Sequence, residues 1–129
     1  MHSTELFALE LSVLLFIVHV LVQATFARGE FGDLYLFSPR DEQRVVKGAV
    51  AARAERALKN FTENYGAFIA VDLGLIATGQ TGGWGAMLWV IARVAYLAVY
   101  LAGIPFLRTA CWVAALVGVL MMLWRLAGW

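Results

Sequence analysis

Charged residues are scarce in this chain. Lysine, arginine, aspartate and glutamate make up only 15% of its 129 residues, whereas 62% are hydrophobic. Because a soluble domain usually carries about 25% charged residues, this composition excludes an ordinary soluble domain and indicates a small integral membrane protein. The formal net charge of +1 provides no extensive basic surface, and the aromatic residues do not alternate with basic clusters. Both observations exclude a nucleic-acid-binding protein.

The residues that build disulfides, metal sites and covalent catalysts are also few. The single cysteine, Cys111, lies in an apolar run and cannot form an intrachain disulfide, so we expect it to be a small packed side chain. No cluster of metal-ligating residues is present, and no metal is predicted. The stretch GQTGGWG (79–85) lacks the lysine and the serine or threonine of a phosphate-binding loop, so it is interpreted as a turn.

The N-terminus lacks the basic residues of a secretory signal. Its first ten residues include Glu5 and Glu10 but no lysine or arginine, and no clear small-x-small cleavage site follows. We therefore expect the first apolar stretch to be a genuine transmembrane helix.

Four stretches have the length and character of membrane spans, at about residues 7–26, 57–76, 84–102 and 106–125. Each approaches the ~20 residues that cross a bilayer. The connections TGQTGG (78–83) and AGIP (102–105) are tight, so neighbouring helices should run antiparallel. The sequence predicts an all-α membrane protein in which residues 1–129 form one bundle of four transmembrane helices.

The connection after the first span is long and polar. Within it, Ser38, Pro39 and Asp41 have the order of an N-cap, a first-turn proline and an acidic third position. This order predicts that a helix begins at Ser38 and continues into the second span, with a bend at Gly48.

The distribution of basic residues predicts the orientation of the spans. The first connection is the most basic segment near them, and by the positive-inside rule it should face the cytoplasm, with both termini on the opposite side. Its basic residues are Arg28, Arg40, Arg44 and Lys47. Trp84, Trp124 and Trp129 fall near the opposite interface, where tryptophans are enriched, and Arg125 is a single basic residue on that side.

Polar side chains within the spans follow two helical stripes. Spacings of i, i+3, i+7 and i+10 place four residues on one face of the second span, and i, i+3 and i+7 place three on one face of the third. An ionisable group at the membrane centre costs roughly 2.5 to 3.5 kcal/mol on insertion scales and usually faces the interior of a bundle. We expect both stripes to face a shared interior, close to Arg108 at the start of the fourth span. The stripes are Arg53, Arg56, Asn60 and Glu63, and Arg93, Tyr96 and Tyr100.

Two interpretations of these charges are open. Glu63 and Arg93 either form an ion pair that holds the second and third helices together, or belong to a binding site. An ion pair would still leave Arg53, Arg56 and Arg108 as surplus positive charge. Such a surplus suits a small anionic ligand, because a guanidinium binds carboxylates as a planar fork.

Two other ionisable residues within the spans are assigned structural roles. Asp72 lies about 180° around the helix from the stripe, and we expect its carboxylate to have a partner, near Arg93 or at a subunit contact. His19 has no second histidine or acidic residue at helical spacing. A hydrogen-bonded packing role is therefore favoured over proton transfer.

The stretches RAERALKNFTE (53–63) and ARVAYLAVYLAGIPFLRT (92–109) resemble the MAPEG family, the membrane-associated proteins in eicosanoid and glutathione metabolism, in a short bacterial-type form. The resemblance runs from about Asp41 to the C-terminus. It implies a left-handed four-helix bundle that assembles as a homotrimer and binds glutathione between adjacent subunits toward the cytoplasm. It also implies the inner membrane of a bacterium as the location.

The resemblance assigns roles to individual residues. Arg108 matches the arginine that stabilises the glutathione thiolate, and it is the expected catalytic residue. A thiol with the ordinary pKa of about 8.5 is mostly protonated at neutral pH, and an adjacent guanidinium favours the thiolate. A neighbouring subunit is expected to supply Arg108 and both tyrosines of the third span. With the remaining stripe residues included, the predicted glutathione-binding set is Arg53, Arg56, Asn60, Glu63, Arg93, Tyr96 and Tyr100.

Two positions need comment beside this resemblance. Asn64 stands where some family enzymes have a tyrosine after the glutamate, and Tyr65 follows one residue later. Asp41 follows a proline, as does an aspartate with a catalytic role in part of the family, but capping of the predicted helix and interaction with its dipole are the favoured explanation of Asp41.

Three functions follow from these patterns. The favoured one is a glutathione-dependent enzyme that conjugates lipophilic electrophiles or reduces lipid hydroperoxides, because Arg108, Tyr96 and Tyr100 are all present. The second is a non-catalytic lipid-binding or scaffold protein of the same family, since a fold alone does not confer activity. The third is a plain structural subunit, which the arginine surplus disfavours. The expected partners are copies of this chain, membrane lipids and a lipophilic substrate.

Overall fold

The computed structural model describes residues 3–129, so the predicted domain of residues 1–129 begins two residues outside the described part. The described chain forms α1 (Thr4–Phe31), α2 (Asp33–Phe37), α3 (Ala49–Thr78), α4 (Gly85–Ala102) and α5 (Pro105–Leu126). No strand occurs within these residues, in agreement with the predicted all-α class.

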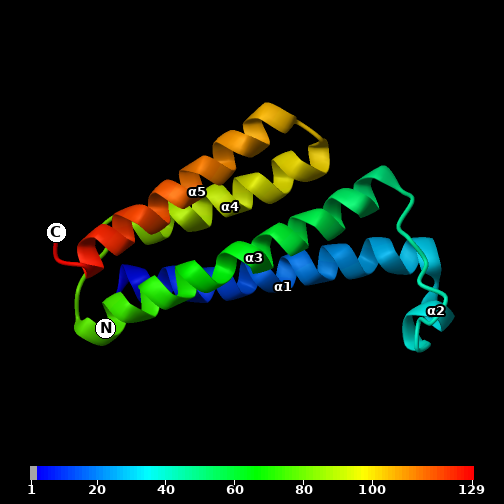
Figure 1. Ribbon diagram of the computed structural model, residues 1–129, viewed down its shortest axis with the longest axis horizontal. Helices are drawn as coiled ribbons and strands as arrows, with labels where there is room; N and C mark the ends of the chain where they lie inside the picture. Colours follow the sequence, from blue (N-terminus) through cyan, green and yellow to red (C-terminus); the bar gives the residue numbers. More distant parts are fainter. Residues whose placement is uncertain (1–2) are drawn as a thin grey trace.

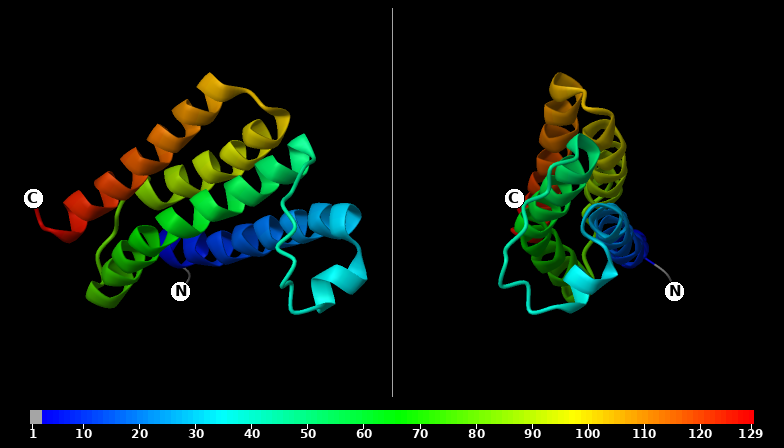
Figure 2. Two further views of the ribbon diagram at one scale, coloured as in Figure 1. Left: turned by 45° about the vertical axis from the view of Figure 1, so that its right-hand side comes forward. Right: turned by 90° about the vertical axis from the view of Figure 1, so that its right-hand side faces the viewer.

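The four long helices run antiparallel to their neighbours along the chain (Figures 1 and 2). α1 packs along α3 and α4 packs along α5, while α4 also contacts α1 and α3, and α3 contacts α5. The start of α1, the α3–α4 turn and the C-terminus lie at one end of the molecule. The segment containing α2 and the α4–α5 turn lie at the other end. This arrangement sets the polar stripe of α3 opposite the polar stripe of α4.

Among residues 3–129, three helices have the length and composition of membrane spans, namely α1, α4 and α5. Their most apolar 18-residue windows have mean hydropathies of 2.2, 1.7 and 2.0. α3 has 30 residues, enough to cross a bilayer, but it is not among these three helices. Composition therefore supports three of the four predicted spans, and a membrane crossing by α3 stays a prediction.

The core forms where aromatic side chains of α3 and α4 meet α1. Phe61 and Phe68 are fully buried, and the ring of Phe68 stacks on that of Trp89 with 4.0 Å between centroids. His19 of α1 is buried against Phe61, with its Nδ1 hydrogen-bonded to the carbonyl oxygen of Leu15 at 2.9 Å. The packing role expected for His19 is confirmed.

Two glycines allow α4 and α5 to approach closely. A Cβ added to Gly85 would lie 2.7 Å from the carbonyl oxygen of Gly118, and a Cβ added to Gly118 would lie 2.6 Å from that of Gly85. At the other end of this hairpin, Gly103 caps the C-terminus of α4 with a left-handed φ of 78°, and Pro105 opens α5. Cys111 of α5 is half-buried against the core, as expected. The hairpin carries half of the predicted site residues.

The predicted helix start at Ser38, Pro39 and Asp41 is wrong. Ser38 instead ends α2, and residues 39–47 are turns and irregular structure. Arg40 and Gln43 have φ angles of 60° and 49°, in the left-handed region that a right-handed helix excludes. Capping of a helix at this point therefore no longer explains Asp41.

α3 begins ten residues later than Pro39, at Ala49, with Gly48 as its N-cap rather than as a bend within it. The reason is a carboxylate from elsewhere in the chain. Glu30, near the end of α1, accepts hydrogen bonds from the backbone N–H groups of Lys47 and Gly48. Glu30 thus satisfies donors at the start of α3 and places negative charge at the positive end of its dipole.

Arg93 is not a partner of Asp72 within the described residues, and a role for Asp72 at a subunit contact stays a prediction. Asp72 is fully buried within the single chain, and within residues 3–129 neither of its carboxylate oxygens has a hydrogen-bond partner. Glu5 accepts hydrogen bonds from Thr81 Oγ1 at 2.9 Å and from the backbone N–H of Gly82 at 2.8 Å, which ties the start of α1 to the α3–α4 turn.

Candidate functional site

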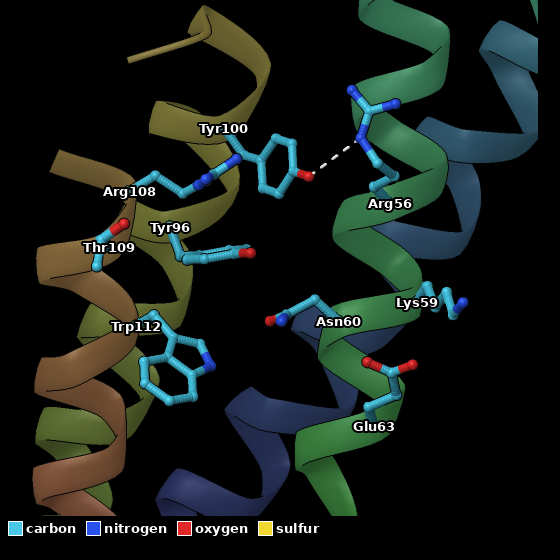
Figure 3. Close-up of a pocket in the computed structure, with 9 residues that line it drawn as sticks. All are labelled: Arg56, Lys59, Asn60, Glu63, Tyr96, Tyr100, Arg108, Thr109 and Trp112. Atoms are coloured by element: carbon cyan, nitrogen blue, oxygen red, sulfur yellow. Dashed lines mark hydrogen bonds between the residues drawn. The ribbon is translucent and has the colours of Figure 1, made fainter. Parts of the chain in front are cut away.

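The polar stripes line one cavity of about 490 Å³ between α3 on one side and α4 and α5 on the other (Figure 3). This volume lies within the range of small-molecule sites, roughly 300 to 1,000 Å³. Six of the eight predicted site residues contribute to the lining. The full lining is Arg56, Lys59, Asn60, Glu63, Tyr96, Tyr100, Arg108, Thr109 and Trp112.

α3 supplies one wall through Arg56, Asn60 and Glu63, whose helical spacing puts them on one face as predicted. Arg56 Nε donates a hydrogen bond to Tyr100 Oη at 3.2 Å, which joins the two walls near the α4–α5 turn. Asn60 points from α3 toward the opposite wall, where its Oδ1 accepts from Arg93 Nη1 at 2.8 Å. These two bonds hold Arg56 and Asn60 in defined positions.

α4 and α5 supply the opposite wall. Tyr96 and Tyr100 are 4% and 9% exposed and meet edge to face, with 5.4 Å between ring centroids. Arg108 lies over the ring of Tyr100, 4.9 Å from its centroid. Within residues 3–129 no hydrogen bond or ion pair occupies the guanidinium of Arg108, so its N–H groups are available to a ligand.

The charge of the lining favours an anion. Three of its side chains are cationic, those of Arg56, Lys59 and Arg108, and one is a carboxylate, that of Glu63. Tyrosine hydroxyls and the Asn60 amide add neutral hydrogen-bonding groups. Because such interactions strengthen where water is partly excluded, the cavity is suited to a small, anionic ligand rich in hydrogen-bonding groups.

Two predicted site residues lie outside this cavity. Arg53 donates from Nη1 to the carbonyl oxygen of Leu101 at 3.3 Å and lines an adjoining cavity of about 140 Å³, beside Arg56 and Arg108. Gly103 makes room for it, because a Cβ there would lie 2.7 Å from the Arg53 guanidinium. Arg93 lines a separate cavity of about 50 Å³ between α3, α4 and α5.

The ion-pair interpretation of Glu63 and Arg93 is wrong. The Arg93 guanidinium bonds to Asn60 and lies over the rings of Tyr96 and Phe61, 4.3 and 5.3 Å from their centroids. Glu63 is exposed, and between residues 3 and 129 it forms no ion pair with Arg93. Helical spacing predicted that both residues face the interior between α3 and α4. The register of the two helices, however, places Asn60 and not Glu63 opposite Arg93.

A single chain brings both walls of the cavity together. The cavity therefore forms without a neighbouring subunit, which was expected to supply Tyr96, Tyr100 and Arg108. A contribution from a second copy stays a prediction.

Three lining residues were absent from the predicted set, namely Lys59, Thr109 and Trp112. Trp112 lies four residues beyond Arg108, so the helical periodicity of α5 could have found it. Thr109 directly follows Arg108, and helical spacing does not place it on the same face. Lys59 directly precedes Asn60 and lies outside the spacing of the predicted stripe.

The positions noted beside the family resemblance, Asn64, Tyr65 and Asp41, also lie outside the main cavity. Asn64 lines the small cavity with Arg93, and its Nδ2 donates to the carbonyl oxygen of Asn60 at 2.7 Å. Tyr65 turns toward α1, where its hydroxyl hydrogen-bonds to Ser12 Oγ at 2.8 Å, so it does not replace a tyrosine at position 64. Asp41 is exposed in the segment before α3.

Apolar helices of membrane-spanning length around a polar, cation-rich cavity define the chain as an integral, all-helical membrane protein. The sequence profile of the MAPEG family matches residues 6–128, nearly the whole chain, and the protein belongs to that family. The resemblance noted in the two motifs is thereby confirmed. Members of the family are typically oligomeric and generally use glutathione, so membership supports a role in glutathione-related or lipid metabolism at the membrane. No curated protein and no solved structure matched the chain.

Proposed function

We propose that this protein is a glutathione-dependent membrane enzyme that conjugates lipophilic electrophiles or reduces lipid hydroperoxides. The observation that carries the proposal is the gathering of Arg56, Tyr96, Tyr100 and Arg108 around one cavity of ligand size. These residues come from three helices, and Arg56 lies 40 residues before Tyr96 along the chain. Membership of a family that generally uses glutathione supports the assignment of the ligand.

The polar groups of the cavity match those of the tripeptide. Glutathione carries two carboxylates, which suit the guanidinium of Arg56 and the ammonium of Lys59. Its amino group suits the carboxylate of Glu63, and its amides suit the side chain of Asn60 and the hydroxyl of Tyr96. In this arrangement the lining binds the peptide and orients its thiol.

Arg108 would activate that thiol. A thiol with an ordinary pKa of about 8.5 is mostly protonated at neutral pH, and an adjacent guanidinium lowers its pKa by favouring the thiolate. The ring of Tyr100 supports Arg108 from one face and leaves its N–H groups for the sulfur. The lipophilic substrate would approach from the bilayer and meet the thiolate at the cavity.

The proposal includes an assembly and a membrane placement. We infer a homotrimer of left-handed four-helix bundles in which α3 is the fourth span, since its polar stripe faces α4 and not lipid. The basic segment between α1 and α3 would face the cytoplasm of a bacterial cell, with both termini across the inner membrane.

Calorimetric titration of glutathione into the purified protein in lipid nanodiscs tests the binding step. Wild type should bind, and Arg56→Met should weaken binding roughly 10- to 100-fold, the effect of losing a hydrogen bond to a charged group. Arg125→Met is the matched control, because Arg125 is exposed near the far end of α5 and lies outside the cavity. Absence of binding to wild type would overturn the proposal, and binding without conjugation or peroxidase activity would identify the non-catalytic alternative.

A further inference from the structure

Arg93 is buried with most of its hydrogen-bonding capacity unused. Its side chain is 1% exposed, and Nη1 donates to Asn60. Within residues 3–129, Nε and Nη2 have no partner, and no carboxylate forms an ion pair with the guanidinium. Buried polar groups without partners are expensive, and a guanidinium stays charged. These N–H groups therefore suit an acceptor that arrives with a ligand.

The cavity beside Arg93 is separate from the main one and differs in character. Its volume of about 50 Å³ holds one or two atoms the size of a water oxygen, since a water molecule occupies about 30 Å³ in the liquid. Apart from Asn64 and Arg93 the lining is apolar or aromatic. Ala67 on α3 and Leu116 on α5 are exposed, so the cavity reaches the outer flank of the molecule between these helices. A small oxygen-bearing group fits inside, while any attached hydrocarbon must extend outward.

The depth of Arg93 indicates which part of a lipid would reach it. Arg93 lies at the middle of α4, a helix of 18 residues with the composition of a membrane span. The carboxylate of a fatty acid stays near the membrane surface, whereas an oxygenated group in the middle of its chain lies near the bilayer centre. Trp112 lines both this cavity and the main one. A group held by Arg93 would therefore lie beside the site proposed for glutathione.

We propose that Arg93 binds an oxygen atom carried in mid-chain by the lipophilic second substrate, such as that of a hydroperoxide, epoxide or hydroxyl group. The hydrocarbon lies along the apolar flank formed by Ala67, Leu116 and Val119. This assignment rests on the proposed function and makes Arg93 a residue of the second-substrate site instead of a glutathione contact. It selects lipids by the position of their oxygen along the chain.

The test compares three fatty acids of equal length: octadecanoic acid, 2-hydroxyoctadecanoic acid and 12-hydroxyoctadecanoic acid. Their affinities are measured without glutathione, by displacement of a fluorescent fatty acid from the protein in nanodiscs. Wild type should bind the 12-hydroxy acid about tenfold more tightly than the other two, as expected for one hydrogen bond to a charged group. Because glutathione is absent, this result does not depend on whether glutathione binds.

Arg93→Met should abolish the preference, while Arg125→Met should retain it. Leu116→Trp is a second variant that fills the mouth of the cavity at an exposed position without touching the Arg93 bond to Asn60, and it should also abolish the preference. Equal binding of all three acids by wild type would overturn the proposal. A preference that survives in both Arg93→Met and Leu116→Trp would also overturn it. The proposal would likewise be overturned if Arg93→Met kept the preference but lowered the affinity for glutathione as far as Arg56→Met does.

Discussion

At the residue scale, Tyr100 connects the two walls of the cavity. Its hydroxyl accepts from Arg56 Nε and its ring lies under Arg108. Tyr100→Phe keeps the ring and removes the acceptor, so Arg56 loses its orientation while Arg108 keeps its support. We expect glutathione affinity to fall roughly 2- to 10-fold in calorimetric titration, the net value of one ordinary hydrogen bond.

Tyr65→Phe is the matched control for this prediction. Its hydroxyl is bonded to Ser12, outside the cavity. Removing it should lower the melting temperature and leave glutathione affinity unchanged. Equal affinities of wild type and Tyr100→Phe would show that the bond to Arg56 has no part in binding.

Which residues belong to the site was predictable from the sequence where helical spacing decides the face of the helix on which a residue lies. Spacing placed Arg56, Asn60 and Glu63 on one face of α3, and the structure brings all three to one cavity. Spacing within one helix carries no information about the register between helices. For that reason the contact of Arg93 with Asn60 was missed, and Glu63 was considered as its partner.

At the scale of helices, Gly118 sets how closely α5 approaches α4. A Cβ at this position would lie 2.6 Å from the carbonyl oxygen of Gly85 and 3.0 Å from the backbone nitrogen of Trp89, and backbone atoms cannot move aside singly. Gly118→Ala should therefore separate the helices and lower the free energy of unfolding by about 1 to 3 kcal/mol, the usual cost of overpacking. Thermal unfolding in detergent measures the change.

Gly66→Ala provides the comparison. No atom lies within 4 Å of a Cβ added to Gly66, which is exposed within α3. The same substitution there should be neutral or stabilise the protein by up to about 1 kcal/mol, because alanine favours a helix over glycine. If Gly118→Ala were as stable as Gly66→Ala, the close approach of α4 and α5 would be contradicted.

Helix boundaries were predictable where the signal is local. Pro105 opens α5 and Gly103 ends α4 as their conformational preferences require. The start of α3 was not, because its capping carboxylate comes from Glu30, 17 residues before Lys47 along the chain. Ser38 and Pro39 form a valid local capping pattern, which a contact from α1 overrides.

At the scale of the whole molecule, the position of α3 decides whether the chain crosses the membrane three or four times. α1, α4 and α5 have the composition of spans. α3 is as long, and its buried aromatic side chains pack against α1 and α4. We predict that α3 crosses as well, so the segment before it and the turn after it lie on opposite sides.

Labelling of single cysteines tests this topology. In a Cys111→Ala background, Asp41→Cys and Gln80→Cys each place one thiol at an exposed position before or after α3. A membrane-impermeant maleimide applied to intact bacteria should label the Gln80→Cys variant, and should label the Asp41→Cys variant only after the cells are opened. Equal labelling of both variants in intact cells would mean that α3 does not cross.

The central claim concerns the sulfur of bound glutathione, and its thiolate absorbs in the ultraviolet. Titration of that absorbance with pH, in the complex with wild type and with Arg108→Met, measures the claim most directly. Since a guanidinium stabilises the anion, the bound thiol in wild type should have a pKa well below its ordinary value of about 8.5, and Arg108→Met should return it toward that value. A bound thiol that titrates at its ordinary pKa in wild type, or a lowered pKa that Arg108→Met leaves unchanged, would contradict the role assigned to Arg108.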